Sequence, residues 1–298
     1  MSTTEIQHNF IDIKGIRTHY LSAGQADAPS TVVLLHGGGV DTARLSWELL
    51  IPELAGEHRV LAPDWPGFGE SDRPDIDYTS EFYIQFLHDF LDALHIQRLS
   101  LAGISMGGAA ALGFALRSPQ RVDKLVLVDS YGLQRVAPAH FFSYLFIKIP
   151  GVNALTWAAM RNRAMARYTL GSLLRRPGAV TDELVDQLYQ EILKPDGDRA
   201  WTRFQNSDIT WRGVKTCFMD RLGEIQAPTL IVHGTKDVAV PVENAREAHA
   251  RITGSKLVWM EGCGHWPQRD NPPEFNRVVR EFLASKVAET AKEVEKPS

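Results

Sequence analysis

The pentapeptide Gly-Ile-Ser-Met-Gly at residues 103–107 constrains the fold of this chain more than any other stretch. An apolar run of strand character, 99–102, precedes it, and a run of small and apolar residues typical of a buried helix, 108–116, follows it. A serine at a sharp strand-to-helix turn has a strained backbone, and flanking glycines let strand and helix approach closely enough to hold it. Because such a turn exposes the hydroxyl at the carboxyl edge of a sheet, Ser105 is predicted to be a nucleophile.

Strands and helices alternate along most of the chain, which predicts an α/β fold with a mostly parallel sheet and right-handed crossovers. Residues 47–55 have helical spacing. Besides 99–102, strands are expected at 10–13 and 16–21, joined as a hairpin, and at 31–35, 59–64, 125–129, 228–234 and 256–260.

One long insertion interrupts this alternation. About ninety residues, 132–222, separate two strands and carry helical patterns. A structureless loop of this length is uncommon in a compact domain, so we expect a folded insertion at the carboxyl edge, where ligands bind in such sheets. We therefore predict a core of 1–131 and 223–298 and a helical cap of 132–222 over Ser105; the alternative is an insertion docked elsewhere on the surface. A minority of its aromatic residues should contact ligand, and the candidates are Phe141, Phe142, Tyr144, Phe146 and Trp157.

A serine hydroxyl needs a base to take its proton, and the base needs a carboxylate to orient it. His265 follows the last strand and lies between Gly264 and Trp266, so it is the expected base. Asp237 follows the preceding strand at the same edge and is the expected carboxylate. Two alternatives remain: Asp129, which ends the strand after the serine turn, could replace Asp237, and His140 in the insertion could replace His265.

Acyl transfer also needs donors for the developing oxyanion. The serine turn itself places the amide of Met106. A second donor is expected from the loop after Leu35, where Gly38 and Gly39 allow close backbone approach. The alternative for this glycine run is a flexible turn. His36, just before the glycines, is expected to support the loop.

Composition and charge exclude several other classes of function. Of 298 residues, 44% are hydrophobic and 23% charged, and the net charge of −4 comes without a basic block, which argues against nucleic acid as a partner. Cys217 and Cys263 lie far apart without metal-ligand spacing, so neither a metal nor a cofactor is expected. The chain has no signal-peptide pattern and no spanning apolar run, which predicts a cytoplasmic protein with a small-molecule substrate. The oligomeric state stays open, a homodimer being one option.

Five segments together resemble the α/β-hydrolase fold superfamily: His-Gly-Gly-Gly at 36–39, Asp-Trp-Pro-Gly-Phe-Gly-Glu-Ser-Asp at 64–72, the serine pentapeptide, His-Gly-Thr-Lys-Asp at 233–237 and Gly-His-Trp at 264–266. The resemblance covers nearly the whole chain outside the insertion and the C-terminal tail. It implies a mostly parallel eight-stranded sheet flanked by helices, and a triad of Ser105, Asp237 and His265. Dehalogenases and epoxide hydrolases of this fold need an aspartate nucleophile, so Ser105 argues against those activities.

Within the superfamily, the chain is similar to meta-cleavage product hydrolases, which split carbon–carbon bonds in vinylogous 1,5-diketones, and to related carboxylesterases. The similarity implies substrate binding by Trp266. It also implies a cap arginine for the substrate carboxylate, with candidates Arg161, Arg163, Arg167, Arg175 and Arg176.

Two positions differ from the carbon–carbon hydrolases: Val40-Asp41-Thr42 replaces Pro-Gly-Ala after the glycines, and Ile104 replaces an asparagine before the serine. The leading hypothesis is therefore a serine esterase that cleaves a small or medium apolar ester through an acyl-enzyme. The alternatives are a carbon–carbon bond hydrolase and a ligand-sensing receptor on a slow hydrolase scaffold.

Overall fold

The computed structural model describes residues 4–285, so the outermost parts of the expected core, 1–3 and 286–298, lie outside the described residues. Eight strands form one sheet in the order β1-β2-β4-β3-β5-β6-β9-β10. The six strands from β4 to β10 are parallel, whereas the β1–β2 hairpin is antiparallel and joins β4 through β2. The expected eight-stranded, mostly parallel sheet is confirmed. The strands are β1 (Gln7–Ile13), β2 (Ile16–Ala23), β3 (Thr31–Leu35), β4 (Arg59–Pro63), β5 (Leu99–Ile104), β6 (Val122–Val128), β9 (Thr229–Gly234) and β10 (Lys256–Met260).

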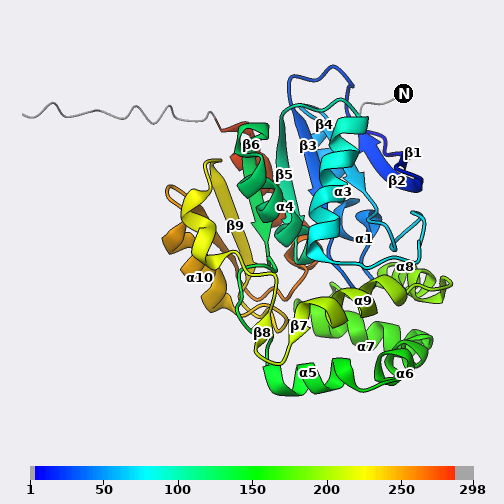
Figure 1. Cartoon of the computed structure of the whole chain (residues 1–298). Coiled ribbons are helices and arrows are strands. Elements are labelled where there is room, and N and C mark those ends of the chain that lie inside the picture. Colours follow the sequence, from blue (N-terminus) through cyan, green and yellow to red (C-terminus); the bar gives the residue numbers. More distant parts are fainter. Residues whose placement is uncertain (1–3, 286–298) are drawn as a thin grey trace, which may run out of the picture.

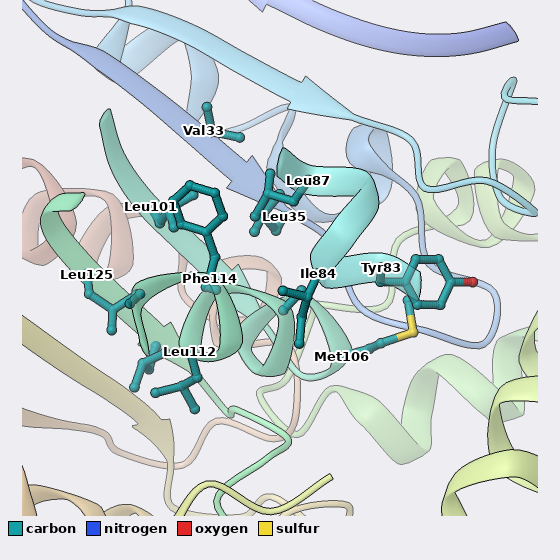
Figure 2. Close-up of a cluster of buried hydrophobic side chains, with 14 of the residues drawn as sticks. Val33, Leu35, Tyr83, Ile84, Leu87, Leu101, Met106, Leu112, Phe114 and Leu125 are labelled. Carbon is teal, nitrogen blue, oxygen red and sulfur yellow. The ribbon is translucent and has the colours of Figure 1, made fainter. Parts of the chain in front are cut away.

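Helices cover both faces of this sheet. On one face, α3, α4 and α10 pack into one hydrophobic cluster, and on the other α1, α2 and α12 pack into a second. Figure 2 shows part of the first cluster, in which side chains of α3 and α4 meet those of β3 and β5. The helices are α1 (Ala43–Trp47), α2 (Ile51–Leu54), α3 (Ser80–Ala93), α4 (Met106–Arg117), α10 (Val242–Arg251), α11 (Pro267–Asp270) and α12 (Pro272–Ala284), with a short 3-10 helix, η1 (Pro119–Arg121).

The stretch 47–55, expected as helical, is divided between two short helices. Helix α1 ends at Trp47 and α2 begins at Ile51, with Pro52 in its first turn. Proline has no backbone N–H to donate to a preceding turn, but it suits a helix start, where that donor is unpaired anyway. A new helix therefore begins here rather than continuing the first.

The insertion between β6 and β9 is mainly helical. In Figure 1 its helices gather at one end of the sheet, the end toward which the strand arrows of β6 and β9 point. Its elements are α5 (His140–Lys148), α6 (Val152–Met160), α7 (Arg163–Leu173), α8 (Asp182–Leu193), α9 (Arg199–Asp208), the paired strands β7 (Ile209–Thr210) and β8 (Gly213–Val214), and a 3-10 helix, η2 (Met219–Glu224).

Helices α7 and α8 share a hydrophobic cluster with the core. Leu170 and Leu188 are completely buried in the same cluster as Leu45 and Trp266 of the core. The division into core and cap at 132 and 222 stays a prediction, since packing is continuous across it. Within residues 4–285, no helix combines the length and the apolar character that crossing a membrane requires.

Candidate active site

Ser105 occupies the turn between β5 and α4, as the sequence predicts. Its φ of 50° and ψ of −120° lie outside the regions that L-residues ordinarily adopt. The glycines around it explain how the turn is held. A Cβ atom on Gly103 would overlap the backbone of Gly107, and one on Gly107 would overlap the carbonyl of Leu35 in β3. Only glycine at both positions lets β5, α4 and β3 approach closely enough to hold the serine in this strained conformation.

Met106 contributes to the site in two ways. Its side chain is buried in the first hydrophobic cluster, where it points toward Tyr83 of α3 (Figure 2). Its amide is the first of helix α4, one of the N–H groups that have no partner within the helix. Side-chain packing thus fixes the turn while the backbone N–H stays available, which suits the predicted oxyanion donor.

The structure brings Asp237 and His265 together. The Nδ1 atom of His265 lies 2.8 Å from Oδ2 of Asp237. The other oxygen of Asp237 accepts hydrogen bonds from the amides of Ala239, at 2.7 Å, and Val240, at 3.1 Å. Burial opposes ionisation of Asp237, but the adjacent His265 and these donors outweigh it and lower the pKa of the carboxyl. An ionised Asp237 fixes the His265 ring and leaves Nε2 for proton transfer.

Asp129, the alternative carboxylate, lies beside this pair but has a different partner. Its Oδ1 accepts a hydrogen bond from the amide of Gly234 at 3.0 Å, and its other oxygen is buried and accepts from no donor of the described residues, while the carboxyl as a whole interacts with that of Asp237. Burial and the charge of Asp237 raise the pKa of Asp129 well above its ordinary value. A carboxyl held neutral in this way cannot stabilise an imidazolium as an ionised one does.

His233 completes this buried group. Its Nε2 lies 3.0 Å from the carbonyl of Val240, 3.4 Å from Asp129 and 3.7 Å from Asp237. Burial lowers the pKa of His233, so the ring is neutral and its Nε2–H donates to the carbonyl. It anchors the loop that carries Asp237.

A metal ion would have one candidate position in the described part of the chain. Asp129, Asp237 and His265 bring potential ligand atoms within 4.8 Å of one another. The hydrogen bond between Asp237 and His265 already engages two of these atoms. The donor set therefore fits a proton-transfer pair better than a metal centre.

Two buried side chains hold the loop after β3, the predicted second source of oxyanion donors. Asp41 accepts hydrogen bonds from the amide of Gly37 and the hydroxyl of Ser46, both at 2.7 Å, and from the amide of Thr42 at 2.8 Å. Nδ1 of His36 lies 2.8 Å from the carbonyl of Gly37, and its Nε2 accepts from the amide of Trp65 at 3.0 Å. These bonds fix both peptide groups of Gly37, and thereby the direction of the Gly38 amide.

A cavity of about 350 Å³ lies over Ser105, and Gly38, Gly39, His265 and Trp266 line it as well. Five of the predicted site residues therefore share one pocket, whereas Asp237 and Met106 do not line it. Helices α6, α7 and α9 of the insertion supply much of the remaining wall. Of the candidate aromatic residues, Phe146 and Trp157 line the cavity, whereas Phe141 and Phe142 are 65% and 70% exposed.

His140, the alternative to His265 as the base, has a structural role. Its Nε2 lies 2.9 Å from the carbonyl of Thr210, so it joins α5 to β7, and it does not line the cavity.

Sequence reasoning missed Trp201 of α9, whose indole lies directly against Gly38: a Cβ atom on Gly38 would overlap its ring. In the sequence, nothing marks Trp201 except that it is an aromatic residue of the insertion.

The fold and the site define a hydrolase with a serine-centred pocket, and comparison with known proteins identifies its family. The family model described as the alpha/beta hydrolase fold matches residues 31–272, so the chain belongs to the α/β-hydrolase fold family.

Its relatives include the 2-hydroxy-6-oxo-2,4-heptadienoate hydrolase of Pseudomonas putida, 33% identical over 91% of this chain and 94% of that protein. The uncharacterized protein Rv2715 of Mycobacterium tuberculosis is 32% identical over 92% of this chain and 80% of its own length. Among solved structures, a meta-cleavage product hydrolase from Pseudomonas fluorescens matches with a TM-score of 0.78 and 29% identity, covering 92% of this chain and 97% of that one. The resemblance to meta-cleavage product hydrolases is thereby confirmed.

Proposed function

We propose that this chain is a serine hydrolase that cleaves a carbon–carbon bond beside a ketone carbonyl, in a substrate of the vinylogous 1,5-diketone type. The observation that carries the proposal is Ser105 on its strained turn, in the same pocket as a His265 ring bonded to an ionised Asp237. The relatives named as dienoate hydrolases support this bond type better than the ester that led the sequence interpretation.

The residues suit a two-stage acyl transfer. His265 takes the Ser105 proton as the oxygen attacks the ketone, and the amides of Gly38 and Met106 stabilise the oxyanion. When the carbon–carbon bond breaks, its electron pair leaves as a conjugated enolate, which takes a proton from His265. Water, activated by His265, then hydrolyses the acyl-Ser105 ester to a carboxylic acid and frees the serine.

The cavity size supports a small or medium substrate. Its volume of about 350 Å³ is at the lower end of small-molecule sites, which span roughly 300–1,000 Å³. Trp266 forms part of its wall and is 3% exposed, so it offers a rigid apolar surface to an acyl group. The proposal therefore keeps Trp266 as a substrate-binding residue.

Ester hydrolysis is the second candidate, and Ile104 favours it. Ile104 is completely buried where the resemblance predicts an asparagine that contacts the dienolate. Without that contact, an alkoxide or phenoxide leaving group, which needs only a proton from His265, becomes a suitable alternative.

A single compound with both bonds separates the two candidates. Methyl 2-hydroxy-6-oxo-6-phenylhexa-2,4-dienoate gives benzoate and a methyl dienoate by carbon–carbon cleavage, but methanol and the free dienoate by ester cleavage. Product analysis by mass spectrometry should show benzoate, and none should form with Ser105→Ala. Methanol without benzoate would establish the ester activity. Tight binding with neither product would favour the receptor alternative instead.

A further inference from the structure

The cavity over Ser105 has an uncharged wall. Apart from His265, every side chain that lines it is apolar or a neutral hydroxyl or amide, so no arginine, lysine or carboxylate of the described residues reaches it. The resemblance to dienoate hydrolases implies the opposite, a cap arginine for a substrate carboxylate. The structure thus differs from that expectation at the feature that decides substrate charge.

Three of the five candidate arginines have partners that do not line the cavity. Arg163 lies 2.6 Å from Asp186 and 3.0 Å from Asp182, and Arg167 also pairs with Asp182. Arg161 donates to the carbonyl of Leu193 at 3.2 Å. None of the five candidate arginines lines the cavity.

Two neutral amides are among the polar groups of the cavity wall. Asn153 of α6 and Gln205 of α9 line the cavity, and neither side chain forms a hydrogen bond with any part of residues 4–285. Thr156, on the same wall, instead donates its hydroxyl proton to the carbonyl of Val152 at 2.8 Å. An amide offers both donors and an acceptor, so Asn153 and Gln205 can pair with a carboxamide, an ester or a ketone.

We propose that this pocket selects substrates that are neutral along their whole buried length, with an uncharged polar end group bound by Asn153 and Gln205. The inference rests on the proposed hydrolase function and specifies its substrate class. Trp157, Trp201 and the two amides are half-buried, so a carboxylate placed among them loses part of its hydration without gaining a counter-charge, which opposes binding.

The test compares isosteric substrates that differ in charge. For the part of the substrate that leaves as the enolate, the pair is 2-hydroxy-6-oxo-6-phenylhexa-2,4-dienoate and its primary carboxamide. For the acyl arm, the pair is mono-4-nitrophenyl adipate and the corresponding 4-nitrophenyl ester with a terminal carboxamide. In at least one pair, kcat/KM for the carboxamide should exceed that for the carboxylate by about 100-fold or more. Equal values in both pairs would overturn the proposal.

A charge-introducing variant tests the cause of the selectivity. Gln205→Arg should reduce the preference for the carboxamide to about tenfold or less by raising kcat/KM for the carboxylate. The matched variant Gln205→Met removes the amide without adding charge, so it should lower kcat/KM for the carboxamide and leave that for the carboxylate low. If a folded Gln205→Arg retains the wild-type preference, the missing cation is not its cause and the proposal is wrong.

Labelling of Ser105 by a fluorophosphonate distinguishes the two levels of failure. If the reagent labels Ser105 in one sample and an untreated sample turns over charged and neutral substrates equally, the neutral-substrate inference alone is contradicted. If Ser105 is not labelled and no substrate is hydrolysed, the hydrolase function fails, and the inference that rests on it fails too.

Discussion

Asp129 and Asp237 lie side by side at the ends of β6 and β9, yet only Asp237 is hydrogen-bonded to His265, at 2.8 Å. Asp129 accepts instead from the amide of Gly234. The two carboxyls also differ in charge, since the pKa of Asp237 is lowered and that of Asp129 is raised. The same cluster therefore contains one ionised and one neutral carboxyl, which divides their roles.

Replacing each carboxyl by its amide should separate these roles. Asp237→Asn should lower kcat by about four orders of magnitude, because the amide cannot hold His265 in the right tautomer. Asp129→Asn should change kcat less than about tenfold, because asparagine resembles a neutral carboxyl and tolerates the positive φ of 39° at this position. Steady-state kinetics of both variants checks this. A larger loss in Asp129→Asn would reverse the assignment.

The raised pKa of Asp129 also has a consequence for stability. The folded state holds the Asp129 proton more tightly than the unfolded state, so the protonated carboxyl adds to the free energy of unfolding. This contribution is complete below the ordinary pKa of 3.8 and is lost as pH rises toward the pKa of Asp129 in the folded protein. Asp129→Asn removes this loss. Its free energy of unfolding should exceed that of the wild type at pH 7, by an excess that shrinks toward pH 4 at up to about 1.4 kcal/mol per pH unit. Urea unfolding at several pH values measures it, and a constant difference would contradict the pKa direction.

Gly38 and Trp201 offer a test of the oxyanion loop. In Gly38→Ala the added methyl group would overlap the Trp201 ring, which is itself stacked on Phe204 at 5.6 Å. Displacing the loop should lower kcat by about 100-fold or more, as loss of an oxyanion donor does. Trp201→Leu in the same chain should restore part of the rate.

Gly39→Asn is the matched control. A Cβ atom on Gly39 meets no atom within 4 Å, and asparagine tolerates its φ of +74°. Because Gly39 lines the cavity, the added side chain should raise KM, but kcat should stay within about tenfold of the wild type, since the loop is not displaced. If it is the more damaging of the two, Gly39 rather than Gly38 determines the loop geometry.

Phe146 and Phe142 separate pocket lining from exposed surface on one helix. Phe146 lines the cavity, whereas Phe142 is 70% exposed and does not. Phe146→Ser should shift the preferred acyl length of 4-nitrophenyl esters toward longer chains, and Phe142→Ser should not. Both variants should keep a melting temperature close to the wild type, because neither side chain is buried. Identical length profiles would show that α5 does not shape specificity.

The sequence predicted the sheet, the serine turn and the Asp237–His265 pair because each depends on local patterns. An apolar run marks each parallel strand, and the residues after Gly234 and Met260 must meet at the same edge of the sheet. The division of residues 47–55 between two helices was not predicted, because a proline that begins a second helix does not disturb the apolar spacing.

The rest of the site depends on contacts between distant segments. The overlap of Trp201 with Gly38 joins α9 to the loop after β3, and no periodicity connects positions so far apart. The candidate arginines could not be placed because their direction depends on Asp182, Asp186 and other partners within the insertion. The role of Asp41, which differs from the family pattern, became visible only through its three donors.

Covalent labelling tests the central claim, that Ser105 is the nucleophile, most directly. A fluorophosphonate should form one adduct, located on Ser105 by peptide mass spectrometry, with activity lost in proportion. Ser105→Ala, with its fold verified by circular dichroism, should show neither adduct nor turnover. An adduct on another serine, together with activity retained in Ser105→Ala, would contradict the account.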